Sequence, residues 1–375
     1  MPDLDLVAFR RDLHAHPETG FNLKRTANAI ALELERGGLE VTRGIGGSGI
    51  VATLRRGEDA EGVALRADMD ALPIEEATSL DYRSCHPGRF HGCGHDGHST
   101  MLLGAALRLA QDPNLDQTVH FLFQPDEENG TGAAAMIADG LFDRFAISRI
   151  YGLHNMPGMP IGSFATQVGP FCAFEDNFEI RVTGLGGHAS MPEKGVDPIV
   201  TGASIVTQLQ TITSRSVSAS DHCVVSVTDF KTDGARNILA SNVFISGDCR
   251  GFEAHVSNTI ERRMRAISNG ICAAQGASCE VHYSTSFQPL VNDLDATAMA
   301  VRAAKEIGNI DAEYGRVGFS EDFAAFLQHR PGAFVLMGNG THGPHAMPLH
   351  NPGYDFNDEA IDSGIAYWCA LAKSG

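Results

Sequence analysis

The sequence predicts an α/β fold in which helices surround a mixed sheet in one large domain, with a smaller α+β domain inserted into it. Three observations support this prediction. A chain of 375 residues with 43% hydrophobic content is long enough to form two cores. Helix-like and strand-like segments alternate from residue 4 to residue 153. Longer alternating strands then dominate between residues 174 and 283.

In chain order, the first region begins with two helices. Apolar side chains recur at helical spacing over residues 4–15 and 24–36, and Gly37 and Gly38 end the second helix. Further along, we expect strands at 40–43, 50–55 and 62–67, a helix at 96–110, a strand at 118–123, a helix at 132–139 and a strand at 148–153. Ligands of such alternating folds gather at the carboxyl ends of the strands.

The second region has a different pattern. Strands are expected at 174–182, 222–230, 242–250 and 278–283, with helices at 198–213 and 253–274. After residue 289 the signals return to those of the first region. We therefore expect residues 1–172 and 290–375 to form the large domain and residues 173–289 to form the inserted domain.

The glycines of residues 44–49 match the spacing of a dinucleotide-binding loop, and Asp68 lies about where a ribose-binding acid would follow. However, residues 50–54 form a β-branched strand and not the start of a helix, so a turn between strands is the better interpretation. This disfavours an alternative function, a zinc-dependent oxidoreductase with a nicotinamide cofactor.

Composition excludes several classes of partner. A net charge of -18, without clusters of Lys and Arg, argues against nucleic-acid binding. The first residues lack the apolar core of a signal peptide, and no apolar run is long enough to cross a membrane, so a cytoplasmic, soluble protein is expected. The eight cysteines are scattered, which indicates free thiols, and only Cys93 has a spacing that suggests a function.

Residues 90–98 contain one cysteine and three histidines, separated mainly by glycines. Thiolate and neutral imidazole are ligands that zinc and similar ions prefer. Cys93 and His95 are two positions apart, so they can face one side from a strand or a tight loop but would diverge on a helix. The alternative is a buried cysteine beside a hydrogen-bonded histidine.

Two adjacent acids, Glu127 and Glu128, follow a strand-like run. A hydrolase with two metals needs one carboxylate as a ligand and another that takes a proton from the attacking water. Neighbouring residues that point apart can divide these tasks. The alternative is a solvated acidic loop.

Other candidates are more ambiguous from the residues alone. His154 follows a strand-like run and could equally be a core histidine, and spacing cannot choose among His342, His345 and His350. Asp68 and Asp70 could orient ligand histidines or belong to a turn.

In the inserted region, His188 lies in a glycine-rich loop, where it is either solvated or able to hydrogen-bond an oxyanion. Asn237 and Arg250 lie at strand ends, and Arg250 could grip a substrate carboxylate or lie at the surface.

Seven segments, taken together and in this order, resemble the M20 metallopeptidase family, in the branch of aminoacylase and hippurate hydrolase-like amidohydrolases. The segments are 11–18 (RDLHAHPE), 65–73 (LRADMDALP), 93–98 (CGHDGH), 124–128 (QPDEE), 187–189 (GHA), 320–323 (SEDF) and 349–350 (LH). The resemblance covers essentially the whole chain. Residues 237–240 lack a proline usual in this branch, and residues 248–249 are Asp-Cys where Thr and an aliphatic residue are common, which concerns the substrate and not the catalytic core.

The resemblance implies a catalytic domain with two divalent metal ions (Zn, Mn, Co or Ni) and an inserted domain that acts as lid and dimerisation surface. The implied metal ligands are Cys93, His95, Glu128, His154 and His350. Glu127 is implied as general base and His188 as oxyanion donor, in some relatives from the partner subunit. Asn237 and Arg250 are implied to bind the substrate.

The implied reaction is hydrolysis of the amide bond of a small N-acyl amino acid, of the N-acetyl or N-benzoyl type. A dipeptidase or carboxypeptidase of the same family is one alternative, and a non-catalytic metal-binding relative is another. A homodimer or higher homo-oligomer is also implied by the resemblance alone.

Overall fold

The computed structural model describes residues 4–57 and 61–374, and these residues form two compact units. Unit 1 comprises the described residues of Met1–Phe171, Val291–Arg316 and Asp322–Gly375, and unit 2 comprises Cys172–Leu290 and Val317–Glu321. Of the residues expected in the large domain, Cys172, Leu290 and the short stretch Val317–Glu321 group with unit 2. The contacts of this stretch there include a bridge between Val317 and Cys172 and a hydrogen bond of 3.0 Å from the amide of Ala173 to the carbonyl of Phe319.

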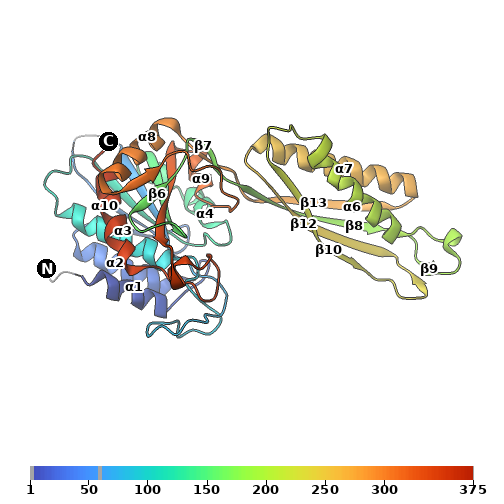
Figure 1. Ribbon diagram of the computed structural model, residues 1–375, viewed down its shortest axis with the longest axis horizontal. Helices are drawn as coiled ribbons and strands as arrows, with labels where there is room; N and C mark the ends of the chain where they lie inside the picture. The colour runs from blue at the N-terminus through green and yellow to red at the C-terminus, as the bar shows by residue number, and fades with distance from the viewer. Residues whose placement is uncertain (1–3, 58–60, 375) are drawn as a thin grey trace. The chain divides into compact units, whose positions relative to one another are not determined.

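Unit 1 is built on a mixed sheet with helices packed against it (Figure 1). The sheet has eight strands in the order β1-β2-β4-β3-β5-β16-β6-β15. The strands are β1 Glu40–Ile45, β2 Gly49–Leu54, β3 Gly62–Asp68, β4 Val119–Gln124, β5 Ile147–Pro157, β6 Ser163–Ala165, β15 Asn309–Asp311 and β16 Gly332–Gly340. The central strands β4, β3, β5 and β16 run parallel, whereas β1, β2 and β6 each have an antiparallel neighbour. β2, β3 and β4 are buried along their whole length, as expected for strands covered on both faces.

The helices of unit 1 are α1 Leu6–Ala15, α2 Lys24–Arg36, α3 His95–Ala110, α4 Gly132–Ala138, α5 Leu141–Arg144, α8 Leu294–Ile307, α9 Ala324–Leu327 and α10 Ile361–Leu371, with short 3-10 turns at Gly343–Ala346 and Asp358–Ala360. α3 is buried along most of its length, because α1, α2 and α10 pack around it. Its apolar residues join those of the sheet and of α8 and α10 in one core. The position of α3 matters for function, since its first residue is His95.

Unit 2 is a four-stranded antiparallel sheet in the order β10-β12-β8-β13, with two helices on one face. The elements are β8 Phe174–Thr183, α6 Pro198–Arg215, β10 Cys223–Thr232, β12 Asn242–Gly251, α7 Ala254–Gln275 and β13 Ser278–Phe287, with a 3-10 turn at Pro192–Lys194. A small sheet of unit 2 pairs β9 (Gly187–His188) with β11 (Ile238–Leu239). Another small sheet pairs β7 (Gly169–Cys172) with β14 (Leu290–Asn292), and most residues of these two strands belong to unit 1. Alternate residues of β8 are buried against the helices, which is the period of a half-covered sheet.

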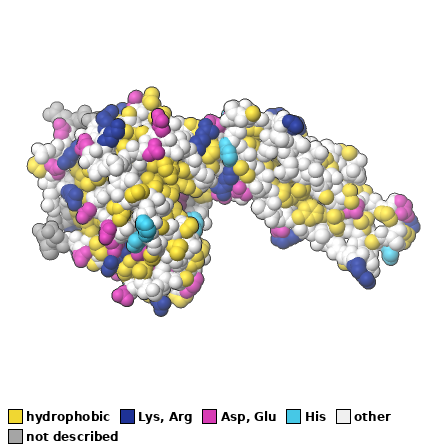
Figure 2. Space-filling view, viewed as in Figure 1, with side chains coloured by type: hydrophobic (Ala, Val, Ile, Leu, Met, Phe, Trp, Pro, Cys, Tyr) yellow, Lys and Arg dark blue, Asp and Glu magenta, His cyan; other side chains and the backbone are white. Residues whose placement is uncertain are grey.

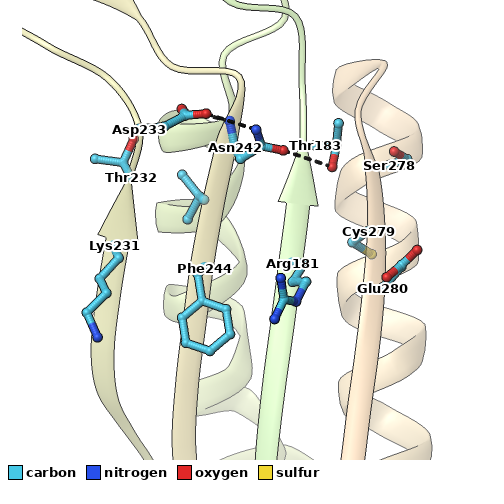
Figure 3. A pocket seen from close by; sticks show the side chains of 11 residues that line it. Arg181, Thr183, Lys231, Thr232, Asp233, Asn242, Phe244, Ser278, Cys279 and Glu280 are labelled. Carbon is cyan, nitrogen blue, oxygen red and sulfur yellow. Dashed lines mark hydrogen bonds between the residues drawn. The ribbon is translucent and has the colours of Figure 1, made fainter.

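The uncovered face of the unit 2 sheet contains a shallow hollow of about 500 Å³ (Figure 3). Its two cations are already paired on their own strands, Arg181 with Glu179 and Lys231 with Asp229. The hollow therefore presents no unpaired cation to an anionic ligand.

The expected fold class is confirmed, an α/β fold with a large mixed sheet and an additional smaller α+β unit. The expected helix at 96–110 and strand at 148–153 correspond to α3 and β5, and the glycines of residues 44–49 form the turn between β1 and β2. Gly44, Gly46 and Gly47 have positive φ there, which explains the glycine pattern without a nucleotide. On the face seen in Figure 2, basic side chains are interspersed with acidic ones. Within the described residues, no helix is long and apolar enough to cross a membrane.

Candidate metal centre and active site

Cys93, His95, His98 and His154 gather where parallel strands end beside the N-terminus of α3. Cys93 Sγ lies 3.4 Å from His154 Nε2, and the ring of His98 lies 5.3 Å from that of His95 and 4.4 Å from that of His154. All four residues are buried. The parallel order of β3, β4 and β5 places their carboxyl ends at one edge, as the sequence predicts for a ligand site.

Gly94 makes the turn that brings Cys93 and His95 to one side. Its φ is 91°, and a Cβ built there would lie 2.4 Å from Asn155 Oδ1 and 2.6 Å from the hydroxyl oxygen of Tyr354. A side chain is therefore excluded both by backbone conformation and by space. This tight loop is the arrangement that the spacing of Cys93 and His95 favours.

The structure brings all five candidate ligands together. The ligand atoms of Cys93, His95 and His154 lie within 4.8 Å of one another, and the same holds for the set Cys93, Glu128 and His350. Cys93 belongs to both sets, so the two sets adjoin, and together they would hold two cations. Glu127 lies in a third such set with His95 and Glu128, so it is beside the ligands.

Hydrogen bonds orient several of these groups. His154 Nδ1 lies 2.7 Å from the carbonyl oxygen of Asn155, so Nδ1 carries the proton and Nε2 presents its lone pair toward Cys93. Burial, reinforced by the neighbouring His98, keeps the pKa of His154 well below its ordinary value, which favours the neutral imidazole that metals bind. The two oxygens of Asp70 accept the backbone amides of Glu127 and Glu128, at 3.1 and 3.2 Å, and so hold the acidic loop in place.

Asp68 anchors a buried network that includes His98, a residue to which sequence reasoning gave no role. Asp68 accepts a hydrogen bond of 2.6 Å from His98 Nδ1, and Arg66 pairs with it at 2.8 Å. On its other side, His98 Nε2 lies 2.8 Å from Asn155 Oδ1. His98 thus supports the site from behind, and its position three residues after His95, one helical turn along α3, is the signal that could have found it.

The electrostatics of the centre fit a cation. Both ring nitrogens of His95 and Glu128 Oε1 are buried and have no hydrogen-bond partner among the described residues. Burial opposes a charge on His95, but the carboxylates of Asp68, Asp70 and Glu128 outweigh it and raise the pKa of His95 to about 10. Burial, with the charges of Asp70 and Asp68, raises the pKa of Glu128 to about 7, although His95 opposes this. Buried polar atoms without partners beside excess negative charge are what divalent ions satisfy.

The backbone is strained at this site. Among the described residues, the non-glycine residues with positive φ are Asp126 (53°) and His350 (66°). Asp126 immediately precedes Glu127 and Glu128, and His350 is a candidate ligand. Left-handed conformations of this kind cost about 1–3 kcal/mol and persist where a structure imposes them, commonly at functional sites.

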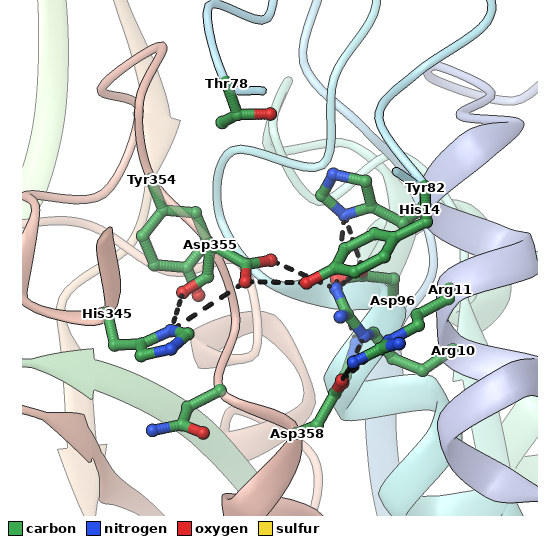
Figure 4. A network of polar contacts seen from close by, with 12 residues as sticks. Arg10, Arg11, His14, Thr78, Tyr82, Asp96, His345, Tyr354, Asp355 and Asp358 are labelled. Atoms are coloured by element: carbon green, nitrogen blue, oxygen red, sulfur yellow. Dashed lines mark hydrogen bonds and ion pairs between the residues drawn. The ribbon is translucent and has the colours of Figure 1, made fainter. Parts of the chain in front are cut away.

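A buried charge network lies beside the centre, on α1 and the start of α3 (Figure 4). Arg10, which is fully buried, contacts Asp96 at 3.2 Å, Asp355 at 3.3 Å and Asp358 at 2.7 Å. His14 Nδ1 lies 2.8 Å from the same oxygen of Asp96. Asp96 directly follows His95, so this network holds the residue next to a candidate ligand.

His14 gives the network a pH dependence. Burial opposes its charged form, but hydrogen bonds to Asp96 and Glu76 outweigh burial and raise the pKa of His14 to about 9, from 6.5. A group whose pKa is raised by folding stabilises the fold fully below its unfolded pKa, and that contribution is lost as the pH rises through the folded pKa. We expect urea unfolding to show a free energy about 3 kcal/mol lower above pH 9 than below pH 6.5 from this group alone. His14→Gln should remove this part of the slope, and an unchanged slope in the variant would contradict the assignment.

In unit 2, His188 and Asn237 come together. β9 pairs with β11, and the amide of Ala189 donates to the carbonyl of Asn237 at 3.2 Å. Both side chains are exposed. The amide of Ser190 donates to His188 Nδ1 at 3.2 Å, so the proton of the neutral ring is on Nε2, where it can be donated to an oxyanion.

Arg250 lies at the other end of β12 from Asn237 and is not brought to His188. Its guanidinium pairs with Glu175 at 2.6 Å and Asp248 at 3.0 Å and donates to Ser320 at 2.7 Å. A role in binding a substrate carboxylate therefore requires Arg250 to exchange at least one of these partners.

Comparison with known proteins agrees with this chemistry. The model of Peptidase family M20/M25/M40 matches residues 64–374. The chain belongs to this family. It is 35% identical over 372 residues to N-acetylcysteine deacetylase of Bacillus subtilis (strain 168), covering 98% of this chain and 96% of that one. It is 36% identical over 366 residues to hippurate hydrolase of Campylobacter jejuni, covering 97% and 94%.

A solved structure supports the metal centre of this M20 chain. The fold matches a dinuclear metal-binding peptidase of the M20 family from Bacillus subtilis with a TM-score of 0.87 and 31% identity, covering 98% of this chain and 96% of that one. The protein is thus an M20-type amidohydrolase, and its gathered Cys, His and Glu side chains are candidate ligands for divalent metal ions.

Proposed function

We propose that this M20 protein hydrolyses the amide bond of N-acyl amino acids, of the N-acetyl or N-benzoyl type, with two divalent metal ions. The observation that carries the proposal is the pair of ligand sets that share Cys93, with Glu127 beside them. Zinc, manganese, cobalt and nickel all suit a mixture of thiolate, imidazole and carboxylate ligands. The deacetylase and hippurate hydrolase relatives favour an acylated amino acid as substrate.

Cys93, His95, Glu128, His154 and His350 would hold the ions. When bound, the ions would supply Lewis acidity, which polarises the amide carbonyl and makes water more acidic. Glu127 would take the proton of the attacking water and pass it to the leaving nitrogen. Burial of its carboxylate beside the ligands suits this task, since Glu127 is 6% exposed and its backbone is held by Asp70.

Residues of unit 2 would complete the site. His188 would donate a hydrogen bond from Nε2–H to the oxyanion of the tetrahedral intermediate, either from the same chain or from a partner subunit of a homo-oligomer. Asn237 and Arg250 would bind the amino-acid part of the substrate. A His188→Ala variant with normal metal content and unchanged turnover would remove His188 from this role.

Metal removal tests the proposal directly. We expect about two metal ions per purified chain by mass spectrometry, loss of amide hydrolysis on chelation, and recovery when zinc, manganese or cobalt is added back. The physical reason is that the polarising charge comes from the ions and not from the protein. A chain that takes up no metal under any loading condition would contradict the proposal and favour a different, non-catalytic role.

The second candidate is a dipeptidase or carboxypeptidase, which the peptidase name of the family model keeps open. Acetyl-amino acids, benzoyl-glycine and dipeptides should be assayed side by side at equal concentration. Preference for the acylated amino acids supports the proposal, whereas preference for substrates with a free α-amine supports the peptidase.

We also propose that the protein is located in the cytoplasm.

A further inference from the structure

A second cluster of metal-binding side chains lies outside the candidate centre, at the end of α1. His16 follows the last residue of this helix, and Cys85 and His86 are adjacent in a loop that packs against it. The ligand atoms of these three residues lie within 4.8 Å of one another. None of the three belongs to the ligand sets around Cys93. Cys85 is one of the seven cysteines whose spacing in the sequence suggests no function.

We propose that His16, Cys85 and His86 form an accessory binding site for a zinc-type divalent cation. One thiolate and two imidazoles are ligands of borderline-soft ions such as Zn²⁺, which bind four ligands in a tetrahedron. Cys85 and His86 are exposed and His16 is partly exposed, so water can complete the coordination. The site therefore needs no residue beyond these three.

The backbone already holds the three residues near one another. The amide of Cys85 donates to the carbonyl of Ala15 at 2.9 Å, which ties the loop to the end of α1. Within the loop, the amide of Ser84 donates to Glu76 at 2.6 Å, and the amide of His86 donates to the Ser84 hydroxyl at 3.1 Å. Little conformational freedom thus remains to be lost on binding an ion.

The histidine rings are placed as ligands require. The rings of His16 and His86 are 5.7 Å apart, at an angle of 61°. His16 Nδ1 lies 2.9 Å from the carbonyl oxygen of Asp12, so Nδ1 carries the proton and Nε2 presents its lone pair. A backbone carbonyl that orients the non-ligating nitrogen is the usual partner of a metal-bound histidine.

Binding releases a proton from Cys85. In the metal-free state, the thiol of Cys85 donates to the carbonyl of Ala15 at 2.9 Å. The ion takes the place of the thiol proton, which passes to solvent, and the thiolate turns from the carbonyl to the ion. The bound ion then joins the end of α1 to the loop at 84–86. The ion would therefore stabilise α1. This helix carries Arg10 and His14, which contact Asp96 next to the candidate ligand His95.

The test compares metal uptake by the intact protein with uptake by matched variants. Wild type, Cys85→Ser, His86→Gln and Cys279→Ser are dialysed against a series of Zn²⁺ concentrations, and bound zinc is measured by mass spectrometry. Cys279 is a suitable control because it is a free, partly exposed cysteine of unit 2, and its thiol contacts Asn269 and Cys272, which are also in unit 2. Cys85→Ser and His86→Gln should bind one equivalent fewer than wild type, and Cys279→Ser should bind the same number. Amide hydrolysis should be unchanged in all three variants.

Two further readouts separate a built site from weak surface binding. Zn²⁺ should raise the melting temperature of wild type more than that of Cys85→Ser. Cd²⁺ should give more thiolate charge-transfer absorbance in wild type than in Cys85→Ser. Equal zinc stoichiometry in wild type and Cys85→Ser would overturn the proposal. The proposal would also fail if wild type bound its additional zinc ion only at Zn²⁺ concentrations at which Cys85→Ser binds an additional ion too. Because each comparison is a difference from wild type, it does not depend on how many ions the centre around Cys93 holds.

Discussion

Replacing Glu127 with glutamine should lower the turnover of amide hydrolysis by about 10²–10⁴-fold while the bound metal stays close to wild type. The amide side chain would keep the shape of the carboxylate but could not take a proton. The backbone amide at this position would still be held by Asp70, so the acidic loop should keep its place. Steady-state kinetics on an acetyl-amino acid, together with metal analysis of the same samples, measure both effects.

Glu128 provides the matched control, because the two carboxylates are adjacent and their backbone amides share Asp70 as acceptor. Glu128→Gln should lose metal as well as activity, since Glu128 lies in a ligand set with Cys93 and His350. If Glu127→Gln also lost metal, Glu127 would be a ligand and not a base. If Glu127→Gln kept wild-type turnover, the proton would have to be taken by another group.

The roles of Glu127 and Glu128 illustrate which parts of the candidate site can be predicted from the sequence. Two adjacent carboxylates after a strand predict a shared site but do not say which one faces the metal. Cys93 and His95 were easier to predict, because a glycine-linked pair with two-residue spacing can face one side from a tight loop. His350 could not be selected from spacing, because residues 341–350 are rich in Gly and Pro and have no periodicity.

The structure distinguishes the three terminal histidines by their contacts. His350 Nε2 lies 3.4 Å from Glu128, whereas His345 Nδ1 lies 3.1 Å from the carbonyl of Asp355 and His342 contacts Thr341. The first contact joins chain segments that are far apart in sequence, whereas the other two are local. The spacing of residues near His350 therefore cannot predict its contact with Glu128, which is distant in the sequence.

The buried charge network of α1 also leaves a signal in the sequence. Arg10 and His14 lie on the same face of α1 as the buried Leu13, so two charged side chains occupy the apolar side of a helix. Such an arrangement indicates a buried partner, which proves to be Asp96. By contrast, His16 and Cys85 are far apart in sequence, and only the packing of a loop on α1 brings them together.

The buried position of Arg10 leads to the largest expected effect on stability. Arg10→Met should lower the free energy of unfolding by about 3–5 kcal/mol, because Asp355 would remain buried without its cation and Asp96 would keep only His14 as a cationic partner. Arg11→Met is the matched control, since Arg10 and Arg11 both pair with Asp358 and both lie over the ring of Tyr82. The Arg11 side chain is 46% exposed, so its removal should cost about 1 kcal/mol or less.

Urea unfolding of the two variants and wild type at one pH measures this difference. Part of the loss in Arg10→Met should be recovered in a double variant with Asp355→Asn, because the second substitution removes the charge of the buried carboxylate that has lost its cation. The loss should also extend to metal affinity, since Asp96 directly follows His95 at the start of α3. Equal destabilisation by Arg10→Met and Arg11→Met would contradict the argument, because it would mean that burial of the carboxylates around Arg10 is not the source of the effect.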